Sequence, residues 1–426
     1  MGESTSGSGK GAPQKRSNTR AIALMATGMW AASRMALALF TYATLLLRPG
    51  DTGAPTSFPA LGQAWLQWDA KWYVQIAQAG YFNEQATAFF PLYPLLVHTV
   101  GVLFGGHYLA AALVVSNLGT LGGFIGLALL AKHEFGAART PSFAVTVLAA
   151  YPLAFFLAAP YTEGPFIALA AFALYCARTG KMRAAAACAF GATLMRPTAV
   201  ILLAPLIWEY GSQRGWWADW RRLDAWRARL RRVFNSDAWR WRGNGGALTA
   251  SLVVGAVPAA LALYMLFLGV RSGDPLLFLH AEQRYWGHAA PGAPVTPGAP
   301  SPAGAAHPST TPFSWLAPSY EQARSLVDLA PLAIFLVLTI LLARRQPVMY
   351  TLYMAGLLLL CVSSPRPDRL GYFGAAGRFL CAALPIFLWL GRWSESRPWL
   401  YLLLTSAGFL LQATLATVFL TGGWLV

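Results

Sequence analysis

The sequence predicts an all-α polytopic membrane protein, because of its composition, its hydropathy and the spacing of its apolar stretches. Of 426 residues, 56% are hydrophobic and only 11% are charged, whereas about a quarter of the residues in a soluble protein are charged. The mean hydropathy is +0.47. Apolar stretches of about 18 to 25 residues recur, and each is long enough to cross a hydrocarbon core of about 30 Å as a helix. We therefore expect a single transmembrane domain over 21–426 and no soluble domain.

The net charge of +16 lies in short basic segments between the apolar stretches. Cytoplasmic loops of membrane proteins carry an excess of Lys and Arg, so these segments act as topology signals and favour a membrane partner over a nucleic acid. All four cysteines fall in apolar stretches, where thiols behave as small hydrophobes. We expect neither disulfides nor a thiolate metal site.

Residues 1–20 are polar and rich in Ser, Gly, Lys and Arg, and we expect them to form a disordered cytoplasmic tail. The first span follows over about 21–47, and the basic residues before it place the amino terminus in the cytoplasm. This span lacks a convincing signal-peptidase site, so we expect it to stay as a helix. The next loop, 48–89, is then extracytoplasmic.

The loop 48–89 has apolar and aromatic residues at near-helical spacing, which predicts a helix lying in the membrane interface. These residues are Trp65, Trp68, Trp72, Tyr73 and Ile76. The segment 91–105 is apolar but short, and Pro91 favours a helix that begins there. Its length leaves open whether it crosses the membrane or only dips into it.

Further spans are expected near 107–131, 141–159 and 161–178. Residues 184–209 pose a conflict, because one complete span would carry the strongly basic segment after it to the wrong side of the membrane. Two half-length helices that meet at Arg196 and Pro197 remove this conflict. Non-helical backbone at membrane depth needs protein or a wet cavity around it, so we expect a cavity with Arg196 pointing into it.

The rest of the chain has two distinctive loops. Residues 211–245 interleave arginines with tryptophans, and we expect an amphipathic segment on the cytoplasmic leaflet, with RNA binding as the alternative. The loop 271–324 is expected to be extracytoplasmic and disordered near 289–312, where Pro, Ala, Gly, Ser and Thr dominate. The remaining spans are expected near 247–270, 325–343, 347–362, 377–391 and 399–422.

Asp69 is the first candidate for a chemical role, because it is an acid that lies where the chain first leaves the membrane. Such a carboxylate suits a general base that takes a proton from an acceptor hydroxyl as that oxygen attacks a sugar carbon. Two alternatives are an N-cap of the helix that follows, since Asp is a favoured capping residue, and a ligand of a hard cation. We predict no metal site, and the histidines lack consistent ligand spacing.

Glu163, Arg196 and Arg378 map to the same side of the membrane as Asp69 in this topology. Glu163 either stabilises a helix start or shares a site with Asp69 and tunes the pKa of the base. Charges in apolar sequence usually face a cavity or a partner, and the forked guanidinium of arginine suits a phosphate. An enzyme facing outward has no nucleotide sugars, so an activated sugar would arrive on a lipid phosphate that Arg196 and Arg378 hold.

The segment from His280 to Gly287 concentrates hydrogen-bond donors and a flat ring. We expect His280, Gln283 and Trp286, together with Trp68 and Glu163, to line the pocket, with the segment as a lid over the sugar or the lipid phosphate. The alternative is an ordinary aromatic cluster at the membrane interface.

Several of these motifs together resemble the GPI mannosyltransferase II (PIG-V) family and its bacterial relatives. In the first external loop they are Trp68-Asp69, Trp72-Tyr73, Gly80-Tyr81 and Phe89-Phe90-Pro91-Leu92-Tyr93-Pro94. Further along they are Tyr151-Pro152, Phe155-Phe156, Tyr161-Thr162-Glu163, Arg196, the segment from His280 to Gly287, and Arg378-Phe379 before Pro385. The likeness covers most of the chain, except the tail, the Arg/Trp segment and the Pro/Ala-rich loop.

This resemblance implies a glycosyltransferase of the GT-C type, a multispanning fold with a catalytic acid in the first external loop, which Asp69 matches. It implies transfer of mannose from a polyprenyl-phosphate donor with inversion at the anomeric carbon. Many GT-C relatives carry paired acids here, whereas Ala70 and Lys71 follow Asp69, which weakens the case for a metal.

The composition is typical of a GC-rich bacterial genome, so we expect an enzyme of the bacterial plasma membrane. The acceptor is then a glycolipid, a cell-wall polysaccharide or a secreted protein rather than a GPI anchor. The alternatives are a carrier or flippase for a lipid-phosphate sugar and a GT-C enzyme that uses arabinofuranose or glucose.

Overall fold

The computed structural model describes residues 11–47, 58–217, 244–286, 320–363 and 375–423. Every regular element within these ranges is a helix. In the described part of the chain, four helices are long and apolar enough to cross a membrane, namely Thr19–Leu46, Tyr108–Phe135, Gly246–Ser272 and Pro398–Leu420. The prediction of an all-α polytopic membrane protein is confirmed.

The first half of the chain forms two membrane-crossing helices and several shorter ones. In order they are α1 (Gly11–Leu46), α2 (Phe58–Ala64), α3 (Asp69–Ala79), η1 (Gln85–Ala88), α4 (Leu92–Leu103), α5 (Tyr108–Phe135), α6 (Thr140–Ala149), η2 (Ala154–Leu157) and α7 (Glu163–Arg178). The second half comprises α8 (Met182–Met195), η3 (Pro197–Leu202), α9 (Leu203–Gln213), α11 (Asn244–Ser272), α12 (Leu277–Trp286), α13 (Tyr320–Leu342), α14 (Val348–Ser363), α15 (Ala376–Phe379), η5 (Leu380–Ala382), α16 (Leu384–Ser396) and α17 (Pro398–Leu420).

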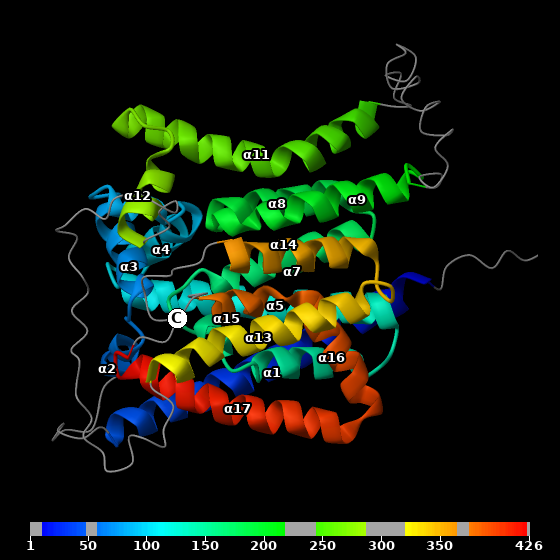
Figure 1. Cartoon of the computed structure of the whole chain (residues 1–426), viewed down its shortest axis with the longest axis horizontal. Helices are drawn as coiled ribbons and strands as arrows, with labels where there is room; N and C mark the ends of the chain where they lie inside the picture. The colour runs from blue at the N-terminus through cyan, green and yellow to red at the C-terminus, as the bar shows by residue number, and fades with distance from the viewer. Residues whose placement is uncertain (1–10, 48–57, 218–243, 287–319, 364–374, 424–426) are drawn as a thin grey trace, which may run out of the picture.

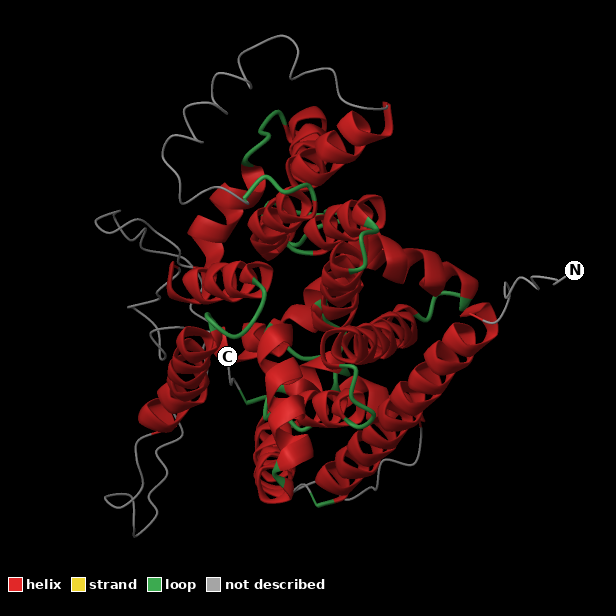
Figure 2. Ribbon diagram, turned by 90° about the vertical axis from the view of Figure 1, so that its right-hand side faces the viewer, coloured by secondary structure: helices red, strands yellow, loops and turns green. Residues whose placement is uncertain are grey.

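The long helices lie side by side along the horizontal direction of Figure 1, and Figure 2 shows several of them end-on. The short helices α2, α3, α4 and α12 gather at one end of this bundle, on the left of Figure 1. We call this the Asp69 end. The turns between α13 and α14 and between α16 and α17 lie at the opposite end, which we call the Arg345 end.

The segment 58–89 contains helices α2 and α3, as its spacing predicts, and α4 begins directly after Pro91. At 1.5 Å per residue α4 is about 18 Å long, which is too short for a complete crossing. Its length therefore favours a helix that dips into the membrane.

The predicted break at Arg196 is confirmed. The backbone of Arg196 is extended, at φ −154° and ψ 138°, between α8 and η3. Glu209 and Gln213 on α9 contact the end of α7, through an ion pair of 3.0 Å with Arg178 and a hydrogen bond of 2.7 Å to the carbonyl of Ala177. Since α8 also begins just after α7, the unit from Met182 to Gln213 enters and leaves at the Arg345 end.

Three expectations about element boundaries are wrong. Helix α1 begins at Gly11, so helix covers half of the tail expected to be disordered, because extending an existing helix costs less than starting one. The span expected over 141–159 is divided after α6, because Pro152 removes a backbone donor. The span expected over 377–391 begins with the short α15 and η5, and the long helix α16 starts only with Pro385 in its first turn.

Two predicted segments lie largely outside the described residues. Of the Arg/Trp segment 211–245, residues 218–243 are not described, and the Pro/Ala-rich stretch 289–312 is not described at all. The expectations for them stay predictions.

Helices α5 and α7 pack backbone to backbone through glycines. A Cβ atom at Gly119 would lie 2.4 Å from the backbone nitrogen of Pro165, and one at Gly164 would lie 2.3 Å from the carbonyl oxygen of Ser116. Small residues allow this approach in membrane proteins, where packing replaces the hydrophobic driving force between helices. The contact holds the first turn of α7, which begins at Glu163, against α5.

Candidate functional site

Asp69 is the first residue of α3, and Trp68 before it has a positive φ of 51°. Positive φ is uncommon for residues other than glycine and marks a constrained turn. The indole nitrogen of Trp68 donates to the carbonyl of Gly423, 3.3 Å away, after the end of α17. Trp68, not Asp69, is the N-cap residue, so the capping interpretation of Asp69 is not the arrangement found.

Four charged side chains form one connected cluster at the Asp69 end. A nitrogen of Arg378 (Nη1) donates to Oδ2 of Asp69 at 2.9 Å, and its Nε lies 3.1 Å from Oε1 of Glu163. The same Oε1 accepts a hydrogen bond of 2.7 Å from Nη1 of Arg196. These residues come from α3, α7, the break after α8, and α15, so the tertiary fold alone brings them together.

The cluster is sheltered to different degrees. The side chain of Glu163 is 3% exposed, whereas that of Asp69 is 21% exposed, with Arg196 and Arg378 in between. Two carboxylates balance two guanidinium groups, and a buried charge is tolerated when it is paired in this way. Oε2 of Glu163 has no hydrogen-bond partner among the described residues. Asp69 is therefore the cluster's accessible acid, and Glu163 is its buried one.

Aromatic rings surround both guanidinium groups. Arg378 lies 5.4 Å from the ring centres of Tyr161 and Phe379 and 5.5 Å from that of Phe156, and Arg196 lies 4.7 Å from Phe379. Cations over aromatic faces are attracted by the ring quadrupole, more so where water is excluded. The rings thus hold the two arginines without neutralising them.

The backbone of Arg378 is fixed by residues that the sequence analysis did not single out. Oδ1 of Asp328 on α13 accepts a hydrogen bond of 2.9 Å from the N–H of Gly377, and the hydroxyl of Tyr151 donates to the Gly377 carbonyl at 2.8 Å. A Cβ at Gly377 would lie 2.6 Å from Leu153 and 2.9 Å from the carbonyl oxygen of Val327, so only glycine fits. Asp328 and Tyr151 are positioning residues for Arg378.

Tyr73 lies beside the cluster on α3, and its hydroxyl is 3.5 Å from Oγ1 of Thr162. Burial raises the pKa of this hydroxyl well above its ordinary value, although the charge of Arg196 opposes the shift. Tyr73 therefore stays neutral at physiological pH.

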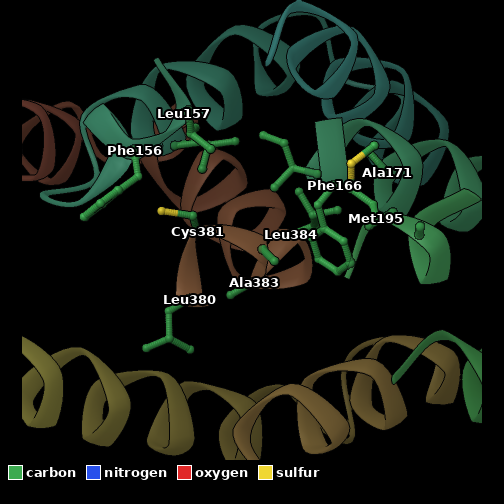
Figure 3. Packing of buried hydrophobic residues seen from close by; sticks show 14 of the residues in the cluster. Phe156, Leu157, Phe166, Ala171, Met195, Leu380, Cys381, Ala383 and Leu384 are labelled. Carbon is green, nitrogen blue, oxygen red and sulfur yellow. The ribbon is translucent and has the colours of Figure 1, made fainter. Parts of the chain in front are cut away.

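A narrow pocket opens next to the cluster, with a free volume of about 10 Å³, roughly the space of one water molecule. Its polar lining is Glu163, Arg196, Thr198 and Arg378, and the other lining residues are apolar. Among them, Cys381 lies in the packed core shown in Figure 3, near Phe156 and Leu157. Asp69 is not part of the lining, but it pairs with Arg378, which is.

The residues predicted to form a lid, His280 and Gln283, do not lie in the pocket beside the cluster. His280 and Gln283 lie on α12, which packs against η1, and both side chains are exposed. Nδ1 of His280 is 2.7 Å from Asp274, and the backbone N–H of Leu276 together with His280 lowers the pKa of this acid. Neither His280 nor Gln283 lines the described pocket, and the side chain of Trp286 lies outside the described residues.

In the described part of the chain, no three His, Cys, Asp or Glu residues gather as the ligands of a metal ion would. Asp69 and Glu163 each face arginine instead. The arrangement suits the binding of an anion after the ion pairs rearrange.

The chain resembles two solved structures. One is the crystal structure of ArnT from Cupriavidus metallidurans bound to undecaprenyl phosphate, at 15% sequence identity and a TM-score of 0.44, covering 92% of this chain and 75% of that one. The other is the archaeal oligosaccharyltransferase AglB from Archaeoglobus fulgidus in complex with an inhibitory peptide and a dolichol-phosphate, at 12% identity and a TM-score of 0.42. That match covers 95% of this chain and 56% of AglB.

No protein-family model matches the chain. None of the curated proteins matches it either. The identities to ArnT and AglB are too low to carry a substrate or a residue role over to this chain, so its function is argued from the cluster.

Proposed function

We propose that this chain is a membrane glycosyltransferase of the GT-C type that transfers a sugar from a polyprenyl-phosphate donor to an acceptor at the Asp69 end. The observation that carries the proposal is the cluster of one accessible acid, one buried acid and two arginines beside a pocket. Glycosyl transfer from a lipid phosphate needs an acid that accepts the proton of the acceptor hydroxyl and guanidinium groups that stabilise the charge of the leaving phosphate.

In the proposed reaction, the Asp69 carboxylate takes the proton of an acceptor hydroxyl. The acceptor oxygen attacks the anomeric carbon from the face opposite the phosphate, and the bond between this carbon and the phosphate oxygen breaks. The electron pair leaves on the lipid phosphate, whose charge Arg378 and Arg196 stabilise. The products are the inverted glycoside, the free polyprenyl phosphate and a protonated Asp69.

Glu163 has a separate role in this proposal. Its carboxylate holds Arg196 and Arg378 together at 2.7 and 3.1 Å, in the place that a phosphate takes when the donor binds. A pocket of about 10 Å³ does not admit a sugar, so donor binding must shift the ion pairs. When Arg378 turns to the phosphate it leaves Asp69, and the base becomes free only once the donor is present.

The sugar is assigned on the motifs alone. Those around Asp69, Glu163, Arg196 and Arg378 resemble the PIG-V family, which supports mannose as the sugar and inversion as the outcome. We further propose that the Asp69 end is extracytoplasmic, because the basic links lie at the opposite end. The acceptor is a glycolipid, a polysaccharide or a protein.

The test uses the full chain in proteoliposomes with polyprenyl-phosphate mannose and crude lipid acceptors. We expect release of free polyprenyl phosphate, and we expect the Asp69→Asn variant to lose it by about a hundredfold or more while it folds normally. Glu84→Gln is the matched control, since Glu84 is another acid of the same external segment and pairs with Arg284 outside the cluster.

A donor panel with arabinofuranose and glucose distinguishes the sugars. Movement of the donor between leaflets without release of the lipid phosphate would identify a carrier and reject the transferase. Near-native turnover by Asp69→Asn would reject the role of the base.

A further inference from the structure

The Arg345 end carries a second basic pocket, which the proposed reaction does not use. It has a volume of about 330 Å³ and is lined by Arg345, Trp393, Arg397, Trp399 and Leu400. Arg345 follows α13, whereas the other residues belong to the end of α16 and the start of α17. Two turns distant in sequence therefore supply one arginine each to the same hollow.

This pocket lies across the molecule from Asp69. The indole of Trp68 contacts Gly423, just after the end of α17, so that end of α17 is at the Asp69 end. Helix α17 begins at Pro398 and is 23 residues long, so it spans about 35 Å. The two turns that carry the pocket are thus at the opposite end of the bundle, on the right of Figure 1.

Within the described ranges, the two arginines of this pocket are not neutralised by an acid. Among the described residues, no carboxylate pairs with the side chain of Arg345 or Arg397. The acid closest in sequence, Glu395, accepts hydrogen bonds from Arg392 and Thr140 instead. A pair of exposed guanidinium groups facing one hollow leaves a net positive charge there.

The orientation of the chain in the membrane does not explain why two arginines share one pocket. Any exposed Arg or Lys at this end would satisfy the positive-inside rule equally well. Arg344 and Arg139 are exposed at the same end and lie outside the pocket lining. The pocket differs from them in having two tryptophans, of which Trp399 is 64% exposed. Tryptophan settles at the level of the headgroups, and basic pockets between transmembrane helices bind anionic lipid headgroups.

We propose that this pocket binds the phosphate headgroup of an anionic membrane lipid, with Arg345 and Arg397 on the phosphate and Trp393 and Trp399 against the glycerol and the first acyl carbons. The volume suits a headgroup, since sites for small molecules have about 300 to 1,000 Å³. The inference does not depend on glycosyl transfer.

The test measures lipid binding by native mass spectrometry of the full chain, titrated with phosphatidylglycerol or with zwitterionic phosphatidylcholine. We expect the tightest site to prefer phosphatidylglycerol, and the R345Q/R397Q variant to bind it about tenfold more weakly. The R139Q/R344Q variant removes the same two charges from the same end and should bind as the parent does. The single variants R345Q and R397Q should each show part of the loss with unchanged melting temperatures.

Two results would overturn the proposal. One is equal weakening in R345Q/R397Q and R139Q/R344Q, which would mean that overall charge, not a site, attracts the lipid. The other is displacement of the lipid by an equal concentration of inorganic phosphate, which would assign the pocket to a soluble anion.

Discussion

At the residue scale, Glu163 is the centre of the cluster, because one of its oxygens contacts both Arg196 and Arg378. The sequence placed Glu163, Asp69 and the two arginines on one side of the membrane through the order of the spans. It did not reveal that a single arginine links both acids, since this depends on the packing of α3, α7 and α15 across hundreds of residues. The roles of these residues stay predictions.

The first residue prediction concerns Glu163→Gln, which keeps the shape of the side chain and removes its charge. Two arginines lose their buried counter-charge, and breaking a buried pair costs about 3 kcal/mol of folding stability. A phosphate then meets less competition for the arginines. We expect a lower melting temperature and a larger stabilisation by added polyprenyl phosphate than in the parent, because a ligand that binds only the folded state raises its stability.

Thermal melts with and without the lipid phosphate measure both effects. Equal or smaller stabilisation of the variant would show that Glu163 does not occupy the place of the phosphate.

The second residue prediction concerns Asp328, which the sequence shows only as one acid near the start of an apolar helix. Its contact with Gly377 lies 49 residues away in the chain, so no local pattern points to it. Asp328→Ala removes the acceptor that holds Arg378 in position, and we expect a higher KM for the donor and a lower kcat. Asp328→Asn keeps an oxygen at this place and should restore part of both.

Leu329→Ala is the control for this variant, because Leu329 is 47% exposed on the next position of the same helix. The assay is donor-dependent release of polyprenyl phosphate, with KM and kcat determined separately. A purely structural role for Asp328 would lower the melting temperature and leave KM unchanged.

At the scale of elements, hydropathy and basic links predicted most helices within a few residues, and the charge argument predicted the break at Arg196. The shorter α6 and the late start of α16 were not predicted, although Pro152 and Pro385 mark them in the sequence. Apolar length alone does not show where a helix bends inside a bundle. Here the buried carbonyls of Ala149 and Tyr151 accept hydrogen bonds from Gln412 of α17, a partner that the sequence does not reveal.

The element prediction concerns the contact of α5 with α7. Gly119→Ala puts a methyl group against the backbone of Pro165, which cannot move aside as a flexible side chain would. We expect a loss of about 2 kcal/mol in stability and reduced transfer, because α7 shifts together with Glu163. Gly255→Ala on α11 is the control, since a Cβ there meets nothing within 4 Å.

Chemical or thermal unfolding of both variants in the same detergent measures the difference. If Gly119→Ala were as stable and active as Gly255→Ala, the close approach of the two helices would not position the cluster.

At the scale of the whole molecule, the two candidate sites are separated along the direction of the helices. The ion-pair cluster involves the start of α3, which lies at one end of Figure 1, and the Arg345 pocket is lined by the turns after α13 and before α17, which lie at the other. The sequence predicted this polarity through the distribution of Arg and Lys. It could not predict the second pocket, because the turn after α13 and the turn before α17 come together only in the folded bundle.

The prediction at this scale is that the Asp69 end is accessible from outside the cell and the Arg345 end is accessible from the cytoplasm. Lys71→Cys on α3 and Ser396→Cys at the end of α16 both replace exposed residues. In intact cells we expect a membrane-impermeant thiol reagent to label Lys71→Cys and to reach Ser396→Cys only after permeabilisation. The parent chain, with its buried and half-buried cysteines, is the control. The reverse labelling pattern would place the cluster in the cytoplasm.

The re-entrant unit from Met182 to Gln213 is anchored at its base, where Arg178 contacts both Glu134 and Glu209. Its tip carries Arg196, about 20 Å away along α8. The position of Arg196 therefore depends on contacts at the Arg345 end, on the opposite side of the bundle. If the proposed function holds, an antibody fragment that tilts this base would act as a non-competitive inhibitor, because it would move Arg196 without occupying the site of the donor or the acceptor.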